Sequence, residues 1–453
     1  MGRLFGTDGV RGIANKELTP ELAFKIGQAG AYVLTKNSGE RPSILVGKDT
    51  RISGDILECA LTAGLCSVGA KVVSVGVIPT PAIAYLVREC GFSAGVMISA
   101  SHNPFEHNGI KFFSSDGYKL SDETEERIEA IILDNAEEIV CPTHEGIGYR
   151  KFDDTLIEKY IDFAVSTAGV RFDGLKVAID CANGASSVTA KRALEKLGAE
   201  VFVSNDKPDG ININDGCGST HLGAISDFVK VSGADVGLAF DGDADRVLAV
   251  DENGTEVDGD KIMAICALDM KKQGNLPDNT IVATVMSNLG FFKMGEEKGI
   301  SIKQTKVGDR YVLEEMLKCG HKIGGEQSGH VILLDHNTTG DGLVTGIALL
   351  SVIKREGKKL SELAKVMQVY PQVLVNATVR NEFKSEEKYM AVSEIREAIE
   401  KLNAEFDGCG RVLIRPSGTE PLVRVMIEGQ DIDVITSRAK ELAALMEKHG
   451  GVN

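Results

Sequence analysis

The stretch Ala94-Gly95-Val96-Met97-Ile98-Ser99-Ala100-Ser101-His102-Asn103-Pro104 joins a short apolar run to a polar loop. The apolar run predicts a buried strand that ends just before the serine. Ligands of open parallel sheets bind beyond the carboxyl ends of the strands, so we expect Ser101 to face a cleft, in a loop that Pro104 stiffens. A hydroxyl in that position can carry a covalent group. The alternative is an ordinary turn, in which Ser, Asn and Pro are common.

A second strand-like run, Asp235 to Phe240, ends in Asp241-Gly242-Asp243-Ala244-Asp245-Arg246. Three carboxylates at alternate positions of a short loop are typical of a divalent-metal site. An EF-hand would need Gly where Arg246 stands and a helix where Val247 to Val250 predicts a strand, so we exclude it. A strand, loop and strand that bind Mg²⁺ and leave room for a phosphoryl group fit better, and a solvated acidic turn is the alternative.

Two further loops carry polar side chains between apolar runs. Arg415-Pro416-Ser417-Gly418-Thr419-Glu420-Pro421, followed by Arg424, offers guanidiniums, hydroxyls and backbone N–H groups to an anion. Gly324-Gly325-Glu326-Gln327-Ser328-Gly329-His330 offers groups that suit the hydroxyls of a sugar ring. The alternatives are a plain hairpin turn for the first loop and a structural histidine for His330.

Together these motifs resemble the α-D-phosphohexomutases over nearly the whole chain. The resemblance includes the opening Phe5-Gly6-Thr7-Asp8-Gly9-Val10-Arg11-Gly12 and the segment Gly47-Lys48-Asp49-Thr50-Arg51-Ile52-Ser53-Gly54. Gln327 and the opening segment are similar to the subgroup that acts on glucosamine phosphates. Mutases of glucose and mannose phosphates, which use the same mechanism, are the alternative.

The resemblance implies an α/β, four-domain architecture, with three similar α/β mixed-sheet domains and a smaller α+β C-terminal domain around a central cleft. A length of 453 residues agrees with several domains. Alternating signals also agree: Thr19-Pro20-Glu21 predicts a helix start, and the Val177 to Ile179 strand precedes a helix predicted from Ser187. The expected domains are 1–154 with the serine loop, 155–255 with the metal loop, 256–370 with the sugar loop and 371–453 with the phosphate loop.

The implied activity is the reversible conversion of glucosamine 6-phosphate to glucosamine 1-phosphate, for UDP-N-acetylglucosamine and peptidoglycan synthesis. A phosphoserine enzyme forms a 1,6-bisphosphate that reorients in the cleft, with Mg²⁺ as cofactor and a hexosamine or glucose 1,6-bisphosphate as activator. The implied residues are, for catalysis, Ser101 (as phosphoserine), His102, Lys111, Arg246 and Arg11; for the metal, Ser101, Asp241, Asp243 and Asp245; for the sugar, Glu326, Ser328 and His330; and for phosphate, Arg415, Ser417, Gly418, Thr419 and Arg424. Lys111, His102 and Arg11 all stay candidates for the general base, a task for which a lysine needs a lowered pKa.

The composition excludes some classes of binding partner and favours one kind of cellular compartment. With 50 basic and 66 acidic residues the net charge is −16, which argues against nucleic acid or an anionic membrane as partner. Nine cysteines without a C-x-x-C pair favour a reducing compartment. The N-terminus lacks an apolar signal core, and no apolar stretch approaches the ~18 residues of a membrane span. We therefore expect a soluble, cytoplasmic protein that binds a small sugar phosphate, and similar enzymes suggest a homodimer.

Three other functions share some of these features. A serine phosphatase would use the same serine and metal but would release phosphate to water. A P-loop kinase is disfavoured because the chain has no G-x-x-x-x-G-K-[ST] motif. A regulator that only binds sugar phosphates would keep the anion and sugar loops, but it would not need a phosphorylatable Ser101 beside a metal loop.

Overall fold

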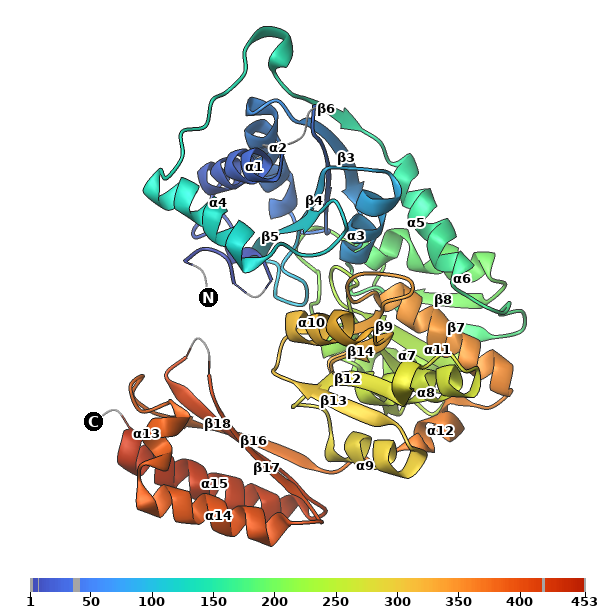
Figure 1. Cartoon of the computed structure of the whole chain (residues 1–453). Helices are drawn as coiled ribbons and strands as arrows, with labels where there is room; N and C mark the ends of the chain where they lie inside the picture. The colour runs from blue at the N-terminus through green and yellow to red at the C-terminus, as the bar shows by residue number, and fades with distance from the viewer. Residues whose placement is uncertain (1–2, 7, 36–40, 418–419, 452–453) are drawn as a thin grey trace. The chain divides into compact units, whose positions relative to one another are not determined.

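The computed structural model describes residues 3–6, 8–35, 41–417 and 420–451. The chain divides into two compact units, coloured by residue number in Figure 1. Unit 1 comprises Met1–Met286 and Ile300–Val366, and unit 2 comprises Ser287–Gly299 and Met367–Asn453. Among the described residues, no helix has the length and apolar character needed to cross a membrane.

The first sheet of unit 1 contains the strand that leads to Ser101. Its order is β1-β5-β4-β2-β3-β6, in which β5 runs antiparallel to β1 and β4 and the other neighbours are parallel. Its elements are β1 (Val10–Ile13), α1 (Pro20–Thr35), β2 (Ser43–Lys48), α2 (Ser53–Ser67), β3 (Lys71–Val77), α3 (Thr80–Glu89), β4 (Ala94–Ile98), β5 (His107–Ser114), α4 (Asp122–Asp134), the 3₁₀ turn η1 (His144–Gly146) and β6 (Tyr149–Phe152). The predicted strand from Ala94 to Ile98 is confirmed, and all five of its residues are buried.

Alternating side chains explain how helices cover both faces of this sheet (Figure 1). Ile44 and Val46 of β2 pack into one apolar cluster with α1, α2 and α4. The opposite face carries Gly47 and Gly95, where an added Cβ would lie 2.8 and 2.7 Å from Ile83 of α3. The missing side chains therefore let α3 approach the sheet closely.

The second sheet, in the order β11-β10-β9-β7-β8, carries the acidic loop. Its elements are α5 (Thr155–Ser166), β7 (Lys176–Asp180), η2 (Ala185–Val188), α6 (Ala190–Lys196), β8 (Glu200–Ser204), η3 (Gly218–Thr220), α7 (Gly223–Ser232), β9 (Val236–Phe240), β10 (Val247–Asp251) and β11 (Glu256–Val257). Because β9 and β10 form an antiparallel pair, the predicted strand, loop and strand is confirmed.

The predicted helix from Ser187 is wrong at its start. Residues Ala185–Val188 form a 3₁₀ turn, and the α-helix begins at Ala190. The Ser186 and Ser187 hydroxyls donate to the Cys181 and Gly184 carbonyls at 3.2 and 2.6 Å. Such local side-chain bonds compete with α-helical pairing, which explains the delay.

The third sheet, in the order β13-β12-β14-β15, completes unit 1. Its elements are α8 (Gly259–Lys272), η4 (Pro277–Asn279), β12 (Thr280–Thr284), β13 (Ser301–Thr305), α10 (Asp309–Cys319), β14 (Ile323–Gly325), β15 (Val331–Leu333), α11 (Gly342–Glu356), α12 (Leu360–Leu363) and η5 (Ala364–Val366). β14 and β15 pair antiparallel, so residues 326–330 form the turn between them.

Unit 2 is built on an antiparallel sheet in the order β16-β18-β17. Its elements are α9 (Leu289–Lys298), β16 (Gln372–Thr378), α13 (Glu386–Met390), α14 (Ser393–Phe406), β17 (Arg411–Pro416), β18 (Leu422–Glu428) and α15 (Ile432–Gly450). Apolar residues of α14 and α15 pack on one face of this sheet in a cluster of their own. The strands with Arg415 and Arg424 therefore form a hairpin, which was the alternative that the sequence left open for this segment.

Candidate functional site

Ser101 follows β4 in a left-handed backbone conformation, with φ of 52°. Its Oγ donates to Asp241 Oδ2 at 2.6 Å and accepts from Arg246 Nη1 at 3.3 Å. A left-handed conformation is uncommon for a residue other than glycine, asparagine or aspartate, and it marks a functional site when its surroundings enforce it. The side chain is completely buried, whereas the sequence predicted that it would face a cleft. A ligand can therefore reach this hydroxyl only when the groups that cover it separate.

The carbonyl groups of the serine loop are held from two sides. Arg51 Nη2 donates to the carbonyl oxygens of Ser101 and Asn103 at 2.8 and 2.9 Å. Asn214 Nδ2 donates to the same Ser101 carbonyl at 2.9 Å. Asp49 orients Arg51 through Nε at 2.9 Å. Sequence reasoning gave none of these three residues a role, although Asp49 and Arg51 lie in a segment that carries the family resemblance.

Replacing Arg51 by lysine is expected to lower both stability and turnover. A lysine cannot bond several carbonyls and Asp49 together, so buried acceptors lose their partners at a cost of about 2–4 kcal/mol. The measurements are urea unfolding and kcat. The control is Arg150→Lys, because Arg150 pairs with Glu58 in a partly exposed position. An Arg51→Lys variant with the wild-type free energy of unfolding would contradict this account.

The acidic loop gathers three buried carboxylates. One oxygen from each of Asp241, Asp243 and Asp245 lies within 4.8 Å of the others. Asp243 Oδ2 accepts from Thr80 Oγ1 at 2.6 Å and from Lys111 Nζ at 2.9 Å. Within the described ranges, Asp243 Oδ1 and Asp245 Oδ1 have no hydrogen-bond partner. Because buried carboxylate oxygens without partners are costly, this donor set fits a divalent cation that prefers oxygen ligands.

The pKa directions within this cluster reflect the balance between burial and charge. Burial raises the pKa of Asp241 well above its usual range, and the neighbouring Asp245 and Asp243 raise it further. Burial also acts to raise the pKa of Asp243, but Lys111 and Thr80 outweigh it and lower that pKa. A cation bound to both groups would relieve the repulsion between them.

Lys111 lies on β5 and is almost completely buried. Its Nζ is 2.8 Å from Asp8 Oδ2 and 2.9 Å from Asp243 Oδ2. Burial alone would lower the pKa of Lys111, but Asp243, Asp8 and Asp245 outweigh burial and raise it. Sequence reasoning required a lowered pKa for a lysine base, whereas the neighbouring carboxylates raise the pKa of Lys111.

His102 lies beside the serine hydroxyl and the Arg246 guanidinium. Its Nδ1 is 3.4 Å from Ser101 Oγ and contacts Arg246 Nη1. Burial lowers the pKa of His102 to about 4, and the charges of Arg246 and Arg11 act in the same direction. The imidazole is therefore neutral near pH 7 and can accept a hydrogen bond.

The depressed pKa of His102 predicts a defined pH dependence of stability. An unfolded histidine titrates near pH 6.5, so below that pH the unfolded chain binds a proton that the folded protein does not bind until about pH 4. Stability present above pH 6.5 is therefore lost as the pH falls toward 4. Urea unfolding across this window should show a smaller loss for His102→Gln than for wild type. The exposed His221 provides the control variant His221→Gln, and equal losses for wild type and His102→Gln would refute the assignment.

The sugar loop lies in unit 1 beside the acidic loop. The Val247 N–H donates to the Gly329 carbonyl at 3.1 Å. Glu326 Oε1 accepts from the Gly308 N–H at 3.2 Å, and Ser328 is exposed. His330 is buried, and in the part of the chain that is described neither of its ring nitrogens has a hydrogen-bond partner.

The hairpin of unit 2 places Arg415 directly opposite Arg424 on the neighbouring strand. Burial lowers the pKa of Arg415, and the charge of Arg424 lowers it further. The Nε atoms of both arginines lack partners among the described residues. Like charges opposite each other destabilise a sheet, so an anion bound here would relieve the repulsion. Ser417 is buried, and Gly418 and Thr419 lie outside the described residues.

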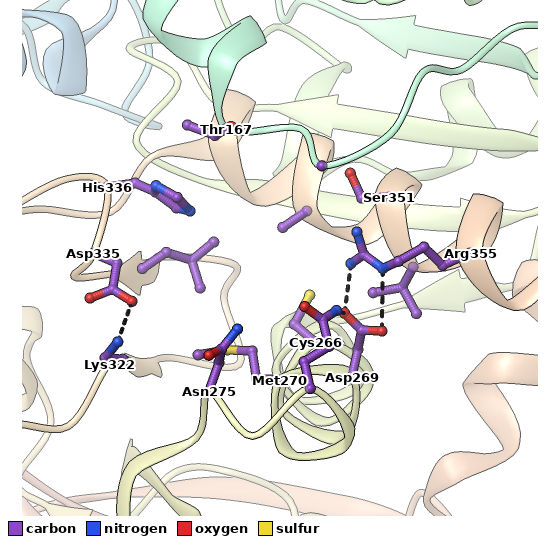
Figure 2. Close-up of a pocket in the computed structure, with 15 residues that line it drawn as sticks. Thr167, Cys266, Asp269, Met270, Asn275, Lys322, Asp335, His336, Ser351 and Arg355 are labelled. Carbon is purple, nitrogen blue, oxygen red and sulfur yellow. Dashed lines mark hydrogen bonds and ion pairs between the residues drawn. The ribbon is translucent and has the colours of Figure 1, made fainter.

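A separate pocket of about 260 Å³ lies in unit 1 (Figure 2). None of the residues predicted for the site lines it. Its charged side chains pair with one another: Lys322 with Asp335 at 2.7 Å, and Arg355 with Asp269 at 2.6 Å. This pocket is therefore distinct from the serine and acidic loops.

Comparison with known proteins accounts for the whole chain. Four family models of phosphoglucomutase/phosphomannomutase match this chain. They are alpha/beta/alpha domain I at residues 2–138, alpha/beta/alpha domain II at 157–254, alpha/beta/alpha domain III at 258–370 and the C-terminal domain at 374–445. The phosphoglucosamine mutase of Acetivibrio thermocellus is 63% identical over 451 residues and covers 100% of both chains. That of Clostridium acetobutylicum is 57% identical over 448 residues and covers 99% of both.

Solved structures agree on the fold. The putative phosphomannomutase of Thermus thermophilus has 25% identity and a TM-score of 0.76, over 99% of this chain and 100% of that one. The Aspergillus fumigatus N-acetylphosphoglucosamine mutase, in complex with GlcNAc-6P and magnesium, has 16% identity and a TM-score of 0.71, over 99% and 96%. The predicted resemblance and the predicted set of three α/β domains and a C-terminal domain are confirmed. The chain belongs to the phosphoglucomutase/phosphomannomutase family, and the two full-length relatives described above are phosphoglucosamine mutases.

Proposed function

We propose that this protein interconverts glucosamine 6-phosphate and glucosamine 1-phosphate through a phosphoserine at Ser101. The observation that carries the proposal is the Ser101 hydroxyl, 2.6 Å from Asp241 within a cluster of three buried carboxylates. Identities of 63% and 57% with full-length phosphoglucosamine mutases support the amino sugar as substrate.

The chemistry consists of two phosphoryl transfers that run in opposite directions. In the first, the P–O bond to Ser101 Oγ breaks and a P–O bond forms to the free hydroxyl of the sugar phosphate, giving a 1,6-bisphosphate. In the second, the bisphosphate has turned round, its other phosphoryl group returns to Ser101 Oγ, and the isomer leaves. A hexosamine or glucose 1,6-bisphosphate would load an unphosphorylated Ser101 by the second transfer.

Asp241, Asp243, Asp245 and Ser101 would hold a magnesium ion. The two carboxylate oxygens without partners support this ligand set. A bound Mg²⁺ would neutralise charge on the transferring phosphoryl group, which is where phosphoryl-transfer enzymes gain most of their rate. Arg246, 3.3 Å from Ser101 Oγ, would bind the oxygens of the same group.

The attacking hydroxyl must lose a proton, and the leaving oxygen must gain one. We assign this exchange to the groups around Asp8 and Ser101, namely Lys111, His102 and Arg11. Their charge states suit them to different proton transfers. The ammonium of Lys111 can donate a proton, and the neutral imidazole of His102 can accept one through its lone pair. Because the two transfers are the reverse of each other, a donor in one can act as acceptor in the other.

Glu326, Ser328 and His330 are assigned to the sugar hydroxyls. Arg415, Ser417 and Arg424, together with Gly418 and Thr419, are assigned to the phosphate that is not transferred. The roles then follow chain order in the four proposed domains, 1–154 for the phosphoserine, 155–255 for the metal, 256–370 for the sugar and 371–453 for the phosphate.

The test is steady-state kinetics with glucosamine, glucose and mannose 6-phosphates, in the presence of Mg²⁺ and a hexose 1,6-bisphosphate. We expect the highest kcat/KM for glucosamine 6-phosphate, with the 1-phosphate as product. Preference for glucose or mannose phosphate would overturn the substrate but keep the mechanism. Release of inorganic phosphate without isomer formation would favour a phosphatase, and no reaction at all would favour a binding protein.

A further inference from the structure

Lys119 lies between two carboxylates that are distant in the sequence. Its Nζ is 2.5 Å from Asp8 Oδ1 and 2.6 Å from Asp309 Oδ2. Asp8 belongs to the N-terminal segment, and Asp309 is the first residue of α10. All three side chains are less than one-fifth exposed. A lysine shared by two carboxylates in such a position is an organised contact rather than a solvated ion pair.

The Asp8 carboxylate is shared in turn with the catalytic groups. Its second oxygen, Oδ2, is 2.8 Å from Lys111 Nζ and also accepts from Arg11. Lys111 then reaches Asp243 of the acidic loop at 2.9 Å. The side chains of Asp309, Lys119, Asp8, Lys111 and Asp243 thus form a continuous series in which acidic and basic groups alternate.

The other end of this series adjoins the sugar loop. Asp309 follows Gly308, and the Gly308 N–H donates to Glu326 Oε1 at 3.2 Å. Gly308 has φ of 130°, a conformation that residues with a side chain disfavour. The backbone at the start of α10 therefore depends on a glycine at this position. Lys119 therefore connects the backbone that supports Glu326 with the carboxylate that supports Lys111.

The charges around Lys119 explain why its side chain stays protonated and paired with both carboxylates. Burial acts to lower the pKa of Lys119, but the charges of Asp309 and Asp8 outweigh it and raise that pKa, so the ammonium is retained. Without it, the cationic partners of Asp8 among the described residues would be Lys111 and Arg11, and Asp309 would lie beside the His330 ring, whose Nε2 is 3.7 Å away. The Asp8 carboxylate would then be held through Oδ2 and no longer through Oδ1, so it would rotate about these contacts and shift Lys111.

We propose that Lys119 is a positioning residue, which fixes Asp8 and through it sets the place of the Lys111 ammonium beside the acidic loop. The inference rests on the proposed function, because it assigns Lys119 to the same reaction. A shift of about 1 Å in a reacting group commonly costs about a hundredfold in rate. We therefore expect Lys119→Met to lower kcat about ten- to hundredfold, with a change in KM of less than about threefold.

The experiment is a double-mutant cycle with kcat and KM for glucosamine 6-phosphate as readouts. Since Lys119 acts through Asp8, the double variant Lys119→Met/Asp8→Asn should be no slower than the slower single variant. Lys119→Arg keeps a cation between the two carboxylates and should recover most of kcat. The control is Lys196→Met, which removes a lysine from between Glu158 and Asp162 elsewhere in unit 1 and should keep wild-type kcat.

The outcomes separate this inference from the proposed function. Wild-type protein that does not act on glucosamine phosphates would refute the function. An active wild type with normal kcat in Lys119→Met, or with losses from Lys119 and Asp8 that multiply, would refute the positioning role. Thermal unfolding of each variant is measured in parallel. If Lys119→Met does not fold, Lys119→Arg and Lys119→Gln replace it, and equal kcat in those two would contradict the need for a cation.

Discussion

Replacing Ser101 by alanine is expected to reduce kcat by at least about a thousandfold, because the variant has no oxygen to carry the phosphoryl group. The Ser101 hydroxyl bonds to Asp241 and Arg246, and both partners have other contacts. The fold should therefore tolerate the change, and binding of the sugar phosphate should persist. The measurement is conversion of glucosamine 6-phosphate with Mg²⁺ and a hexose 1,6-bisphosphate.

Two additional variants make the result specific. Ser67→Ala removes a serine of α2 whose hydroxyl donates to the Gly64 carbonyl, and it should keep wild-type kcat. Ser99→Ala removes the hydroxyl that accepts from the Ser101 N–H at 2.9 Å, and it should give an intermediate loss by loosening the loop. Turnover by Ser101→Ala within tenfold of wild type would sink the phosphoserine account.

Removal of divalent metal is expected to abolish turnover, and Mg²⁺ should restore it. The three carboxylates repel one another within 4.8 Å, and two of their oxygens have no partner among the described residues. Binding of Mg²⁺ to the folded state alone should also raise Tm as its concentration exceeds Kd. Asp241→Asn should lower kcat by about a hundredfold or more and shift the Mg²⁺ dependence to higher concentration.

The matched control for the metal prediction is Asp227→Asn. It changes an exposed carboxylate on α7, the helix that precedes β9 and the acidic loop. It should leave both the activity and the Mg²⁺ dependence unchanged. Full activity after exhaustive chelation, or an Asp241→Asn variant with the wild-type Mg²⁺ dependence of Tm, would show that the acidic loop is not the metal site.

Local patterns were enough to predict the elements that carry the site. The apolar run from Ala94 to Ile98 could only be buried, and the structure buries all five residues. The run from Val247 to Val250, one residue after the three aspartates, argued against a helix, and the structure has β10 there. In both cases the signal is a short continuous apolar run bounded by polar loop residues, which is visible in the local sequence alone.

Contacts between distant segments could not be predicted from the same patterns. Thr80 bonds to Asp243 across 163 positions, and Lys119 bonds to Asp309 across 190. Neither threonine nor lysine stands in a motif that signals such a contact, because the pairing depends on how the domains of unit 1 pack. Burial of Ser101 has the same origin, since Asp241 and Arg246 cover it from another sheet.

The raised pKa of Lys111 could not be predicted from the sequence either. A buried lysine by itself suggests a lowered pKa, which suits a base. The structure surrounds this lysine with Asp8, Asp243 and Asp245, and their charges outweigh burial. The direction of this pKa shift therefore follows from tertiary contacts, which residue type alone does not reveal.

The most direct test of the central claim follows the phosphoryl group itself. Protein labelled with ³²P at Ser101 is mixed with unlabelled glucosamine 6-phosphate and Mg²⁺ for a single turnover, and the products are separated. The account predicts that the label leaves the serine, appears in the 1,6-bisphosphate and in glucosamine 1-phosphate, and is replaced on Ser101 by unlabelled phosphate. Label that is released as inorganic phosphate, or that stays on Ser101 while isomer forms, would contradict it.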